Sequence, residues 1–381
     1  MSAALSGSCF AGCGNGAKKN SDTIVIGCSG PLTGDAAQYG VAVKNAIELA
    51  VKDVNDAGGI NGTKLSYVFE DDEADSGDKA VNAYNALKDN GMQVMVGTVT
   101  TGSCLAVIEK TKQDNIFQLT PSASAQDVIK NDNCFQVCFT DPNQGKGSAD
   151  YIAENKLATK IAVIYDSSDA YSSGIFNTFK SEAEAKGLDI VEEQSFTKDS
   201  KTDFSAQISA AKNAGADVFF APTSTEAAAL IIEQAAAQGL DLPLLAGDTW
   251  DSNVILKAAE GKDVQVYVTT FYQEGGNEDF DNGMKEFINS DSKNLANNGG
   301  DDTIAAVSAM GYDAYYVALE ALKAAGSTDP AKVNEALWDV TYEGVCGKVQ
   351  FDSENGDAQR DTAYVKTANT ETGAWDFVGS S

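Results

Sequence analysis

The pattern of apolar and polar positions alternates between two kinds of segment. Short apolar runs, such as residues 23–28 and 92–96, predict buried strands, whereas residues 41–55 repeat apolar positions near every 3.6 residues and predict a helix. The same alternation returns in the second half, for example at residues 160–165 and 175–186. Strands that alternate with helices are typical of βαβ units with parallel sheets. We therefore expect an α/β protein.

Two neighbouring predicted strands, residues 92–96 and 116–119, both end in loops rich in small hydroxyl residues. In open parallel sheets, ligands bind outside the carboxyl ends of the strands, so we expect both loops at one rim. Hydroxyl groups and free N–H groups at helix starts suit a small anionic or zwitterionic ligand. The hydroxyl residues concerned are Thr100, Thr101, Ser103, Ser122 and Ser124. The alternative is that they act only as helix caps and turn residues.

Composition narrows the class of protein. The 381 residues exceed what a single core usually serves, so we expect two lobes. The chain has 56 acidic and 27 basic residues, a formal net charge of -29, which disfavours nucleic acid and anionic lipid as partners. It contains no histidine, which removes Ser-His-Asp catalysis, Cys-His catalysis and histidine metal sites. We expect neither a cofactor nor a metal.

Five of the seven cysteines lie in the body of the chain, namely Cys28, Cys104, Cys134, Cys138 and Cys346. An odd number cannot all pair internally. Cys134 and Cys138 fall in what the pattern predicts as one strand, and four strand residues span roughly 13 Å, too far for a disulfide. We expect buried free thiols, with one bridge as the alternative.

Residues 1–21 are rich in small residues and show no amphipathic period. Within them, Phe10-Ala11-Gly12-Cys13 resembles the end of a bacterial lipoprotein signal, with Cys13 as the lipid-modified residue, although leucine is usual where Phe10 stands. A plain flexible tail is the alternative. No later stretch approaches 18 apolar residues. We expect an extracytoplasmic bacterial protein, either a cell-surface lipoprotein or periplasmic.

A series of motifs over residues 22–380 resembles the leucine/isoleucine/valine-binding proteins. The motifs are GPLTGDAAQYG, NDAGGINGTKL, a strand ending in EDD, VGTVTTGS and TPSASA, and their order and spacing carry the match. Those proteins are type I periplasmic binding proteins that supply branched-chain amino acid ABC transporters. The resemblance implies two doubly wound parallel-sheet lobes joined by three hinge crossings, near Thr140, Tyr272 and Ser353.

The implied domain division follows from those crossings. Lobe 1 would take residues 22–140 and 273–353, and lobe 2 would take residues 141–272 and 354–381, with the 1–21 tail outside both.

The resemblance also implies a binding site for the head group of an amino acid. In the first lobe, Thr101 matches the family's carboxylate-binding serine, and the hydroxyl of Ser124 would face the α-ammonium. The first-lobe residues assigned in this way are Tyr39, Thr100, Thr101, Ser122, Ala123 and Ser124.

In the second lobe, Tyr171 matches a tyrosine that closes over the ligand. Thr223 stands where leucine-type members have another tyrosine, which changes the size or polarity of the pocket. Asp248 is our choice for the counter-charge to the ammonium, with Asp251 second, and Trp250 would stack on the ligand side chain. The structural alternatives are that Trp250 is a core residue, that Asp248 caps a helix and that Tyr171 lies in a surface loop.

These observations predict a solute-binding protein of a branched-chain-amino-acid-type ABC transporter. We expect it to bind a small amino acid or related carboxylate, with an apolar amino acid favoured, and to present it to permease subunits as a monomer. A sensor of the same fold that reports to a receptor or regulator is the alternative. A hydrolase using Ser122 or Ser124 is disfavoured, because neither serine has a histidine to activate it or sits in a GxSxG motif.

Overall fold

The computed structural model describes residues 23–34, 36–351, 355–358, 360 and 363–380. The predicted lipidation site at Cys13, the 1–21 tail and the predicted crossing near Ser353 lie outside the described residues.

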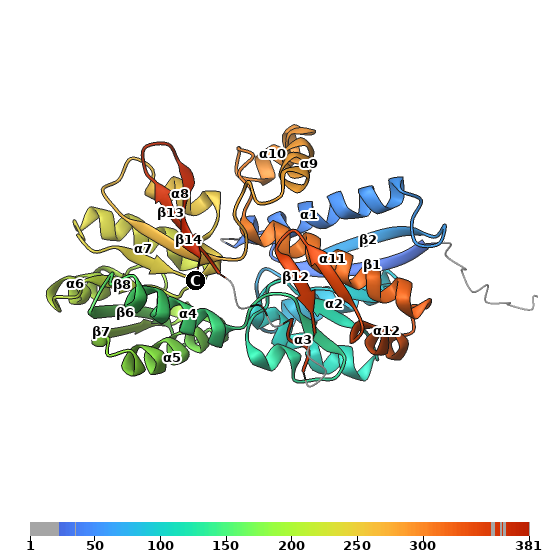
Figure 1. The fold of residues 1–381 in the computed structure, drawn as a ribbon, viewed down its shortest axis with the longest axis horizontal. Helices are drawn as coiled ribbons and strands as arrows, with labels where there is room; N and C mark the ends of the chain where they lie inside the picture. The colour runs from blue at the N-terminus through green and yellow to red at the C-terminus, as the bar shows by residue number, and fades with distance from the viewer. Residues whose placement is uncertain (1–22, 35, 352–354, 359, 361–362, 381) are drawn as a thin grey trace, which may run out of the picture.

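The described part of the chain builds a five-stranded and a seven-stranded sheet, which lie side by side, and a separate two-stranded hairpin (Figure 1). The first has the order β2-β1-β3-β4-β5 and is parallel throughout. Its strands are β1 (Thr23–Gly30), β2 (Lys64–Asp71), β3 (Val94–Val96), β4 (Gln118–Thr120) and β5 (Cys134–Gln136). The elements around it are α1 (Ala37–Asp56), α2 (Asp78–Asp89), α3 (Thr101–Gln113), η1 (Gln126–Ile129), α9 (Glu278–Asn289), α10 (Ser292–Asn297), α11 (Ala306–Ala325), α12 (Pro330–Leu337) and the hairpin β11 (Thr341–Gly344) and β12 (Gly347–Gln350). We call this half lobe 1.

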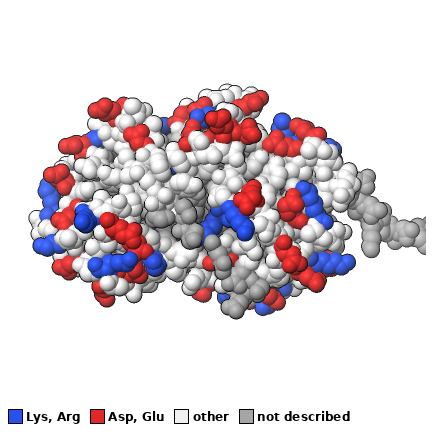
Figure 2. Space-filling model, viewed as in Figure 1, with Lys and Arg blue, Asp and Glu red and all other residues white. Residues whose placement is uncertain are grey.

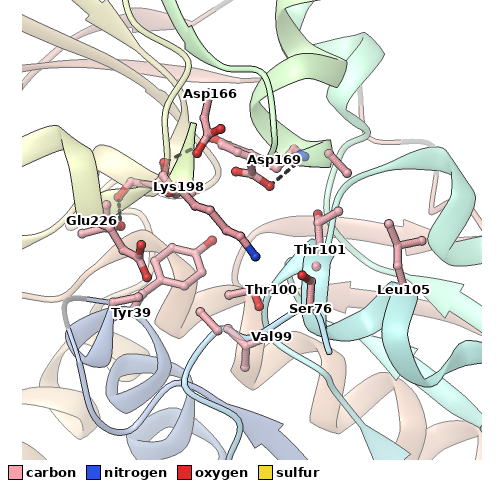
Figure 3. Close-up of a pocket in the computed structure, with 18 of the residues that line it drawn as sticks. Tyr39, Ser76, Val99, Thr100, Thr101, Leu105, Asp166, Asp169, Lys198 and Glu226 are labelled. Carbon is pink, nitrogen blue, oxygen red and sulfur yellow. Dashed lines mark hydrogen bonds between the residues drawn. The ribbon is translucent and has the colours of Figure 1, made fainter. Parts of the chain in front are cut away.

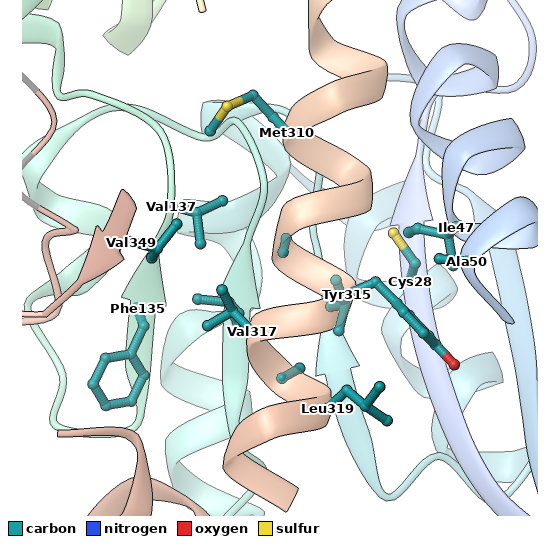
Figure 4. Packing of buried hydrophobic residues seen from close by; sticks show 14 of the residues in the cluster. Cys28, Ile47, Ala50, Phe135, Val137, Met310, Tyr315, Val317, Leu319 and Val349 are labelled. Atoms are coloured by element: carbon teal, nitrogen blue, oxygen red, sulfur yellow. The ribbon is translucent and has the colours of Figure 1, made fainter. Parts of the chain in front are cut away.

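Helix α11 forms the centre of the lobe 1 core. In Figure 4, Tyr315 and Leu319 extend toward the α1 side, and Val317 extends toward Val137 near β5. Gly311 lets α11 approach α1 closely, because a Cβ atom there would lie 3.1 Å from the Cγ1 atom of Val43. This packing fixes α1 and the β3 and β4 ends, which carry candidate site residues.

The second sheet has the order β14-β13-β10-β9-β8-β6-β7. The five strands β10, β9, β8, β6 and β7 are parallel to their neighbours. Strands β13 and β14 continue the sheet beyond β10, and each is antiparallel to its neighbour. The strands are β6 (Lys160–Asp166), β7 (Asp189–Phe196), β8 (Val218–Phe220), β9 (Leu244–Ala246), β10 (Val266–Thr270), β13 (Tyr364–Asn369) and β14 (Ala374–Ser380). The helices are α4 (Asp141–Glu154), α5 (Ala170–Ala185), η2 (Lys198–Ser200), α6 (Ser205–Asn213), α7 (Thr225–Ala237), η3 (Asp248–Trp250) and α8 (Asn253–Ala259). We call this half lobe 2.

The order of elements takes the chain between the lobes after β5, after β10 and after β12. The α/β architecture with parallel sheets is therefore as predicted, and the exact crossing residues stay a prediction. Strand β5 is shorter than predicted, because the chain leaves the sheet after Gln136 and enters α4, whose N-cap Thr140 accepts a hydrogen bond from the Asn143 amide at 3.3 Å.

The five body cysteines are free thiols, as expected, and the alternative of one bridge does not apply to them. Four are buried, and burial raises the pKa of each thiol above its ordinary value.

Charged side chains cover much of the surface. In Figure 2, acidic and basic side chains are interspersed over both lobes of the face shown. Within the described residues, none of the helices combines the length and hydropathy that a membrane span needs.

Candidate functional site

A cavity of about 370 Å³ lies between the two lobes, at the carboxyl ends of their strands. Lobe 1 lines it with the start of α1 and the loops after β2, β3 and β4, and lobe 2 lines it with the loops after β6, β7, β8 and β9. Parallel sheets place ligand sites at this edge because the strand-to-helix loops converge there.

The lobe 1 wall is dominated by the start of α3. Thr100, Thr101 and Gly102 line the cavity. Among the described residues no side chain caps this helix start, and the Thr100 hydroxyl donates instead to the Ser103 hydroxyl at 3.2 Å. The first amide groups of a helix lack backbone partners and carry the positive end of its dipole. This wall therefore suits a negatively charged group.

The second hydroxyl loop contributes less of its surface to the cavity. Ser122 lines the cavity, and its hydroxyl donates to the Val99 carbonyl at 2.6 Å. Ala123 and Ser124 are fully buried, and the Ser124 amide donates to the Thr101 hydroxyl at 3.2 Å. The loop therefore fixes the position of Thr101 from behind.

Two tyrosines line the cavity in front of a buried carboxylate. Tyr39 donates its hydroxyl to Asp248 Oδ2 at 3.0 Å, and Tyr171 donates to Asp248 Oδ1 at 2.9 Å. Gln144 adds a third bond, from Nε2 to Oδ1 at 2.7 Å, and its Oε1 accepts from the Asp248 amide at 3.0 Å. Burial raises the pKa of Asp248, and the three side-chain donors oppose that rise. Asp248 lies behind the tyrosines and does not line the cavity.

Three further residues singled out from the sequence also lie behind the wall. Trp250 is fully buried in the lobe 2 core, where its Nε1 donates to the Thr223 carbonyl at 3.0 Å and hydroxyl at 3.2 Å. Asp251 accepts from Lys366 Nζ at 2.9 Å and from the Thr270 hydroxyl at 2.6 Å. Thr223 is thus the acceptor for a buried indole, which explains a polar side chain at that position.

The structure adds cavity residues that the sequence reading did not assign to the site. They are Ser76 from lobe 1 and Asp166, Asp169, Lys198 and Glu226 from lobe 2 (Figure 3). Asp166 is the last residue of β6, Asp169 lies in the loop after it, and Glu226 lies in the first turn of α7, which follows β8. Their position near a strand end was the available signal. Lys198 belongs to no motif, and only the folded chain brings it to the cavity.

The acids on the lobe 2 wall are held by their own lobe. Asp166 Oδ1 accepts from the Ser168 amide at 2.8 Å and hydroxyl at 2.6 Å. Asp169 Oδ1 caps α5 by accepting from the Tyr171 amide at 3.2 Å, and burial raises its pKa to about 6. Glu226 forms an ion pair with Lys201.

The two walls differ in charge, with an uncapped helix start and hydroxyls on lobe 1 and three carboxylates on lobe 2. This arrangement can hold a small molecule with a negative group at one end and a positive or hydrogen-bond-donating group at the other. Among the residues that the structure describes, no cluster suited to holding a metal ion is present.

Comparison with known proteins gives a consistent result. The family model described as "Periplasmic binding protein" matches residues 23–373. The leucine-, isoleucine-, valine-, threonine-, and alanine-binding protein of Pseudomonas aeruginosa is 30% identical over 343 residues, which cover 88% of this chain and 87% of that protein. The Leu/Ile/Val-binding protein homolog 3 of Brucella melitensis is 34% identical over 227 residues, and the match spans 61% of its length and 59% of this chain.

A solved structure extends the similarity to the fold. The branched-chain amino acid transporter substrate binding protein LivJ from Streptococcus pneumoniae, in complex with isoleucine, is 25% identical with a TM-score of 0.79. The match covers 94% of this chain and 99% of that one.

Proposed function

The chain belongs to the periplasmic binding protein family, and from this premise we propose that its inter-lobe cavity captures a small amino acid or related carboxylate. It is a substrate-binding protein of the branched-chain amino acid ABC transporter class, which works outside the cytoplasm. The ligand leaves unchanged, and the loaded protein delivers it to the permease subunits. We further propose that the protein is a monomer and that Cys13 carries the lipid anchor.

The uncapped start of α3 is the observation that carries this proposal. It faces the cavity through Thr100, Thr101 and Gly102, and an α-carboxylate there would accept bonds from its free amide groups. The lobe 2 carboxylates across the cavity suit the α-ammonium.

Ligand capture by this site requires movement of the lobes. A ligand in contact with both walls binds the closed arrangement more tightly than the open one, so it shifts the population toward closure. Delivery to a permease then depends on the closed form, with no bond made or broken.

A thermal-shift screen of amino acids and small carboxylic acids tests the proposal. A ligand at 100 times its Kd stabilises the folded state by about 2.7 kcal/mol, which a melting curve detects. We expect at least one amino acid to raise the melting temperature. Shifts with sugars or nucleosides alone would contradict the carboxylate assignment.

A pair of variants at Gly102 tests the position of the carboxylate. A Cβ atom at Gly102 would lie 3.2 Å from Cβ of Ser76, so both variants need only a small adjustment. Gly102→Asp places a negative charge on the helix start, where it favours the helix but repels the ligand carboxylate. We expect Gly102→Asp to abolish binding and the nearly isosteric Gly102→Asn to retain most of it. Equal affinities in the two variants would remove the carboxylate from this position.

A further inference from the structure

We infer that Lys198 is a ligand-binding residue that holds the ligand carboxylate from lobe 2, and that the cavity selects a ligand with one carboxylate and a hydrogen-bond-donating side chain. This inference rests on the proposed function and names the ligand class more closely. It departs from the apolar ligand that the sequence favoured.

Lys198 is anchored at its base and free at its tip. Its backbone amide donates to the Ser168 hydroxyl at 3.0 Å, which fixes the start of η2 against the loop after β6. In Figure 3 its side chain extends across the cavity toward Thr100, on the opposite lobe. Lys201 pairs with Glu226, whereas no ion pair of Lys198 is found within the described part of the chain.

The position of this ammonium group matches the carboxylate end of the cavity. The start of α3, the Thr100 hydroxyl and Ser76 lie on the wall that Lys198 faces. A carboxylate there would meet helix amides from lobe 1 and a cation from lobe 2. Charge-assisted hydrogen bonds of this kind are about twice as strong as neutral ones. Lys198 would thus couple recognition of the carboxylate to approach of the lobes.

The lobe 2 wall determines what the rest of the ligand can be. Asp166, Asp169 and Glu226 line it, so a second carboxylate on the ligand would meet like charges at short range. A branched aliphatic side chain would displace water from these acids and offer no donor in return, which is costly. An ammonium, amide or hydroxyl group would satisfy them. The charge pattern therefore disfavours both dicarboxylates and aliphatic amino acids.

A calorimetric titration with four amino acids of equal chain length tests the ligand class. Norvaline, glutamine, ornithine and glutamate differ only at the end of the side chain, which is apolar, amide, cationic or anionic. We expect glutamine or ornithine to bind at least about tenfold more tightly than norvaline and glutamate. Tightest binding of norvaline or glutamate would overturn the proposed ligand class.

A charge-removing variant tests Lys198 itself. We expect Lys198→Met to weaken binding of the preferred ligand at least about tenfold, and Lys198→Arg to restore part of the loss. The matched control is Lys180→Met, because Lys180 pairs with Glu193 on the outside of the same lobe and does not line the cavity. Melting temperatures of all three variants show whether each is folded.

The outcomes separate this inference from the proposed function. If the wild-type protein binds no amino acid, both the proposed function and this inference are overturned. If the wild-type protein binds an amino acid and Lys198→Met binds it equally well, only the role of Lys198 is overturned.

Discussion

At the scale of single residues, the site separates groups that line the cavity from groups that position them. Tyr39 and Tyr171 present their rings to the cavity because Asp248 accepts both hydroxyls from behind. Tyr39 belongs to lobe 1 and Asp248 to lobe 2, so this carboxylate also joins the two lobes. A buried carboxylate with several donors is costly to disturb, since removing the acceptor leaves those donors unpaired.

Replacing Asp248 tests this positioning role. We expect Asp248→Ala to weaken amino acid binding at least about tenfold, because the Tyr39 hydroxyl loses its cross-lobe acceptor and Tyr171 is left with a longer bond to Gln144 Oε1, at 3.4 Å. Isothermal titration calorimetry measures the affinity, and a melting curve shows whether the variant is folded. Unchanged affinity in a folded variant would remove Asp248 from the site.

Asp72 offers a prediction about pH. Burial raises the pKa of this carboxyl, at the end of β2, from an ordinary 3.8 to about 6. Between these values the folded protein keeps a proton that the unfolded chain has released, so the Asp72 contribution to stability falls as pH rises from about 4 to about 6. Asp72→Asn removes this contribution.

Chemical denaturation of wild type and Asp72→Asn at pH 4 and pH 7 checks the sign. Asp169 and Asp313 titrate in the same range in both proteins, so the comparison isolates Asp72. Relative to the variant, the wild type should lose about 1–3 kcal/mol of unfolding free energy between the two pH values. A pH dependence that is the same in both proteins would refute the assignment.

At the scale of elements, close packing of α4 against α5 holds two site residues in place. Gln144 lies on α4 and Tyr171 on α5, and Gly145 of α4 lies against the backbone of α5. A Cβ atom on Gly145 would lie 2.5 Å from the Ile175 carbonyl oxygen and 2.8 Å from the Phe179 amide nitrogen. These are backbone atoms, so the helices must move apart to accept any side chain.

Gly145→Ala should therefore destabilise the protein by about 1–3 kcal/mol, as overpacking usually does, and should weaken ligand binding as well. The control is Gly283→Ala in α9, where the added Cβ would lie 3.4 Å from Leu49 Cδ2, an ordinary contact. That change should be neutral or slightly stabilising, because alanine favours a helix over glycine. Denaturant midpoints measure both effects, and equal midpoints would contradict the packing argument.

The sequence predicted the strands and helices better than it predicted which side chains line the cavity. Apolar periodicity predicted the alternating strands and helices of both lobes, because burial imposes that period on each element separately. Thr100, Thr101 and Ser122 were predicted from hydroxyl-rich loops at strand ends, and Tyr39 and Tyr171 from the family resemblance. All five line the cavity. By contrast, local pattern could not predict which side chains face inward across two lobes.

Trp250 and Lys198 show why local pattern does not predict the residues that line the cavity. Trp250 follows a strand end like a site residue, yet lobe 2 buries it because its core has space for an indole with an acceptor at Thr223. Lys198 follows β7 in a stretch without any motif, and its approach to Thr100 depends on how the two lobes face each other. The arrangement of the lobes depends on the whole chain, so the local sequence around residue 198 does not indicate it.

At the scale of the whole molecule, contacts from α8 of lobe 2 to the segment after α10 of lobe 1 bridge the two halves. Lys257 Nζ lies 3.1 Å from Asp301 Oδ2, and Asn253 Nδ2 lies 3.2 Å from Asp301 Oδ1. Exposed ion pairs of this kind contribute about 0–1 kcal/mol each. These contacts can therefore bias closure without locking it.

Lys257→Ala should weaken ligand binding by about two- to fivefold, since it removes a cross-lobe contact that favours the closed arrangement. Lys262→Ala is the control, because Lys262 Nζ bonds to the Ala258 carbonyl within lobe 2 at 2.6 Å. Calorimetry gives the affinities, and small-angle X-ray scattering should show a larger radius of gyration for unliganded Lys257→Ala than for the control. Identical affinities and radii would show that this contact has no part in closure.

A crystal structure of the protein with an amino acid that the thermal-shift screen identifies shows directly where the ligand binds. We predict electron density in the cavity between the lobes, with the ligand carboxylate at the start of α3 beside Thr101. The ligand should be intact and should contact both lobes. Density for the ligand outside this cavity, or contact with one lobe only, would contradict ligand capture between the lobes.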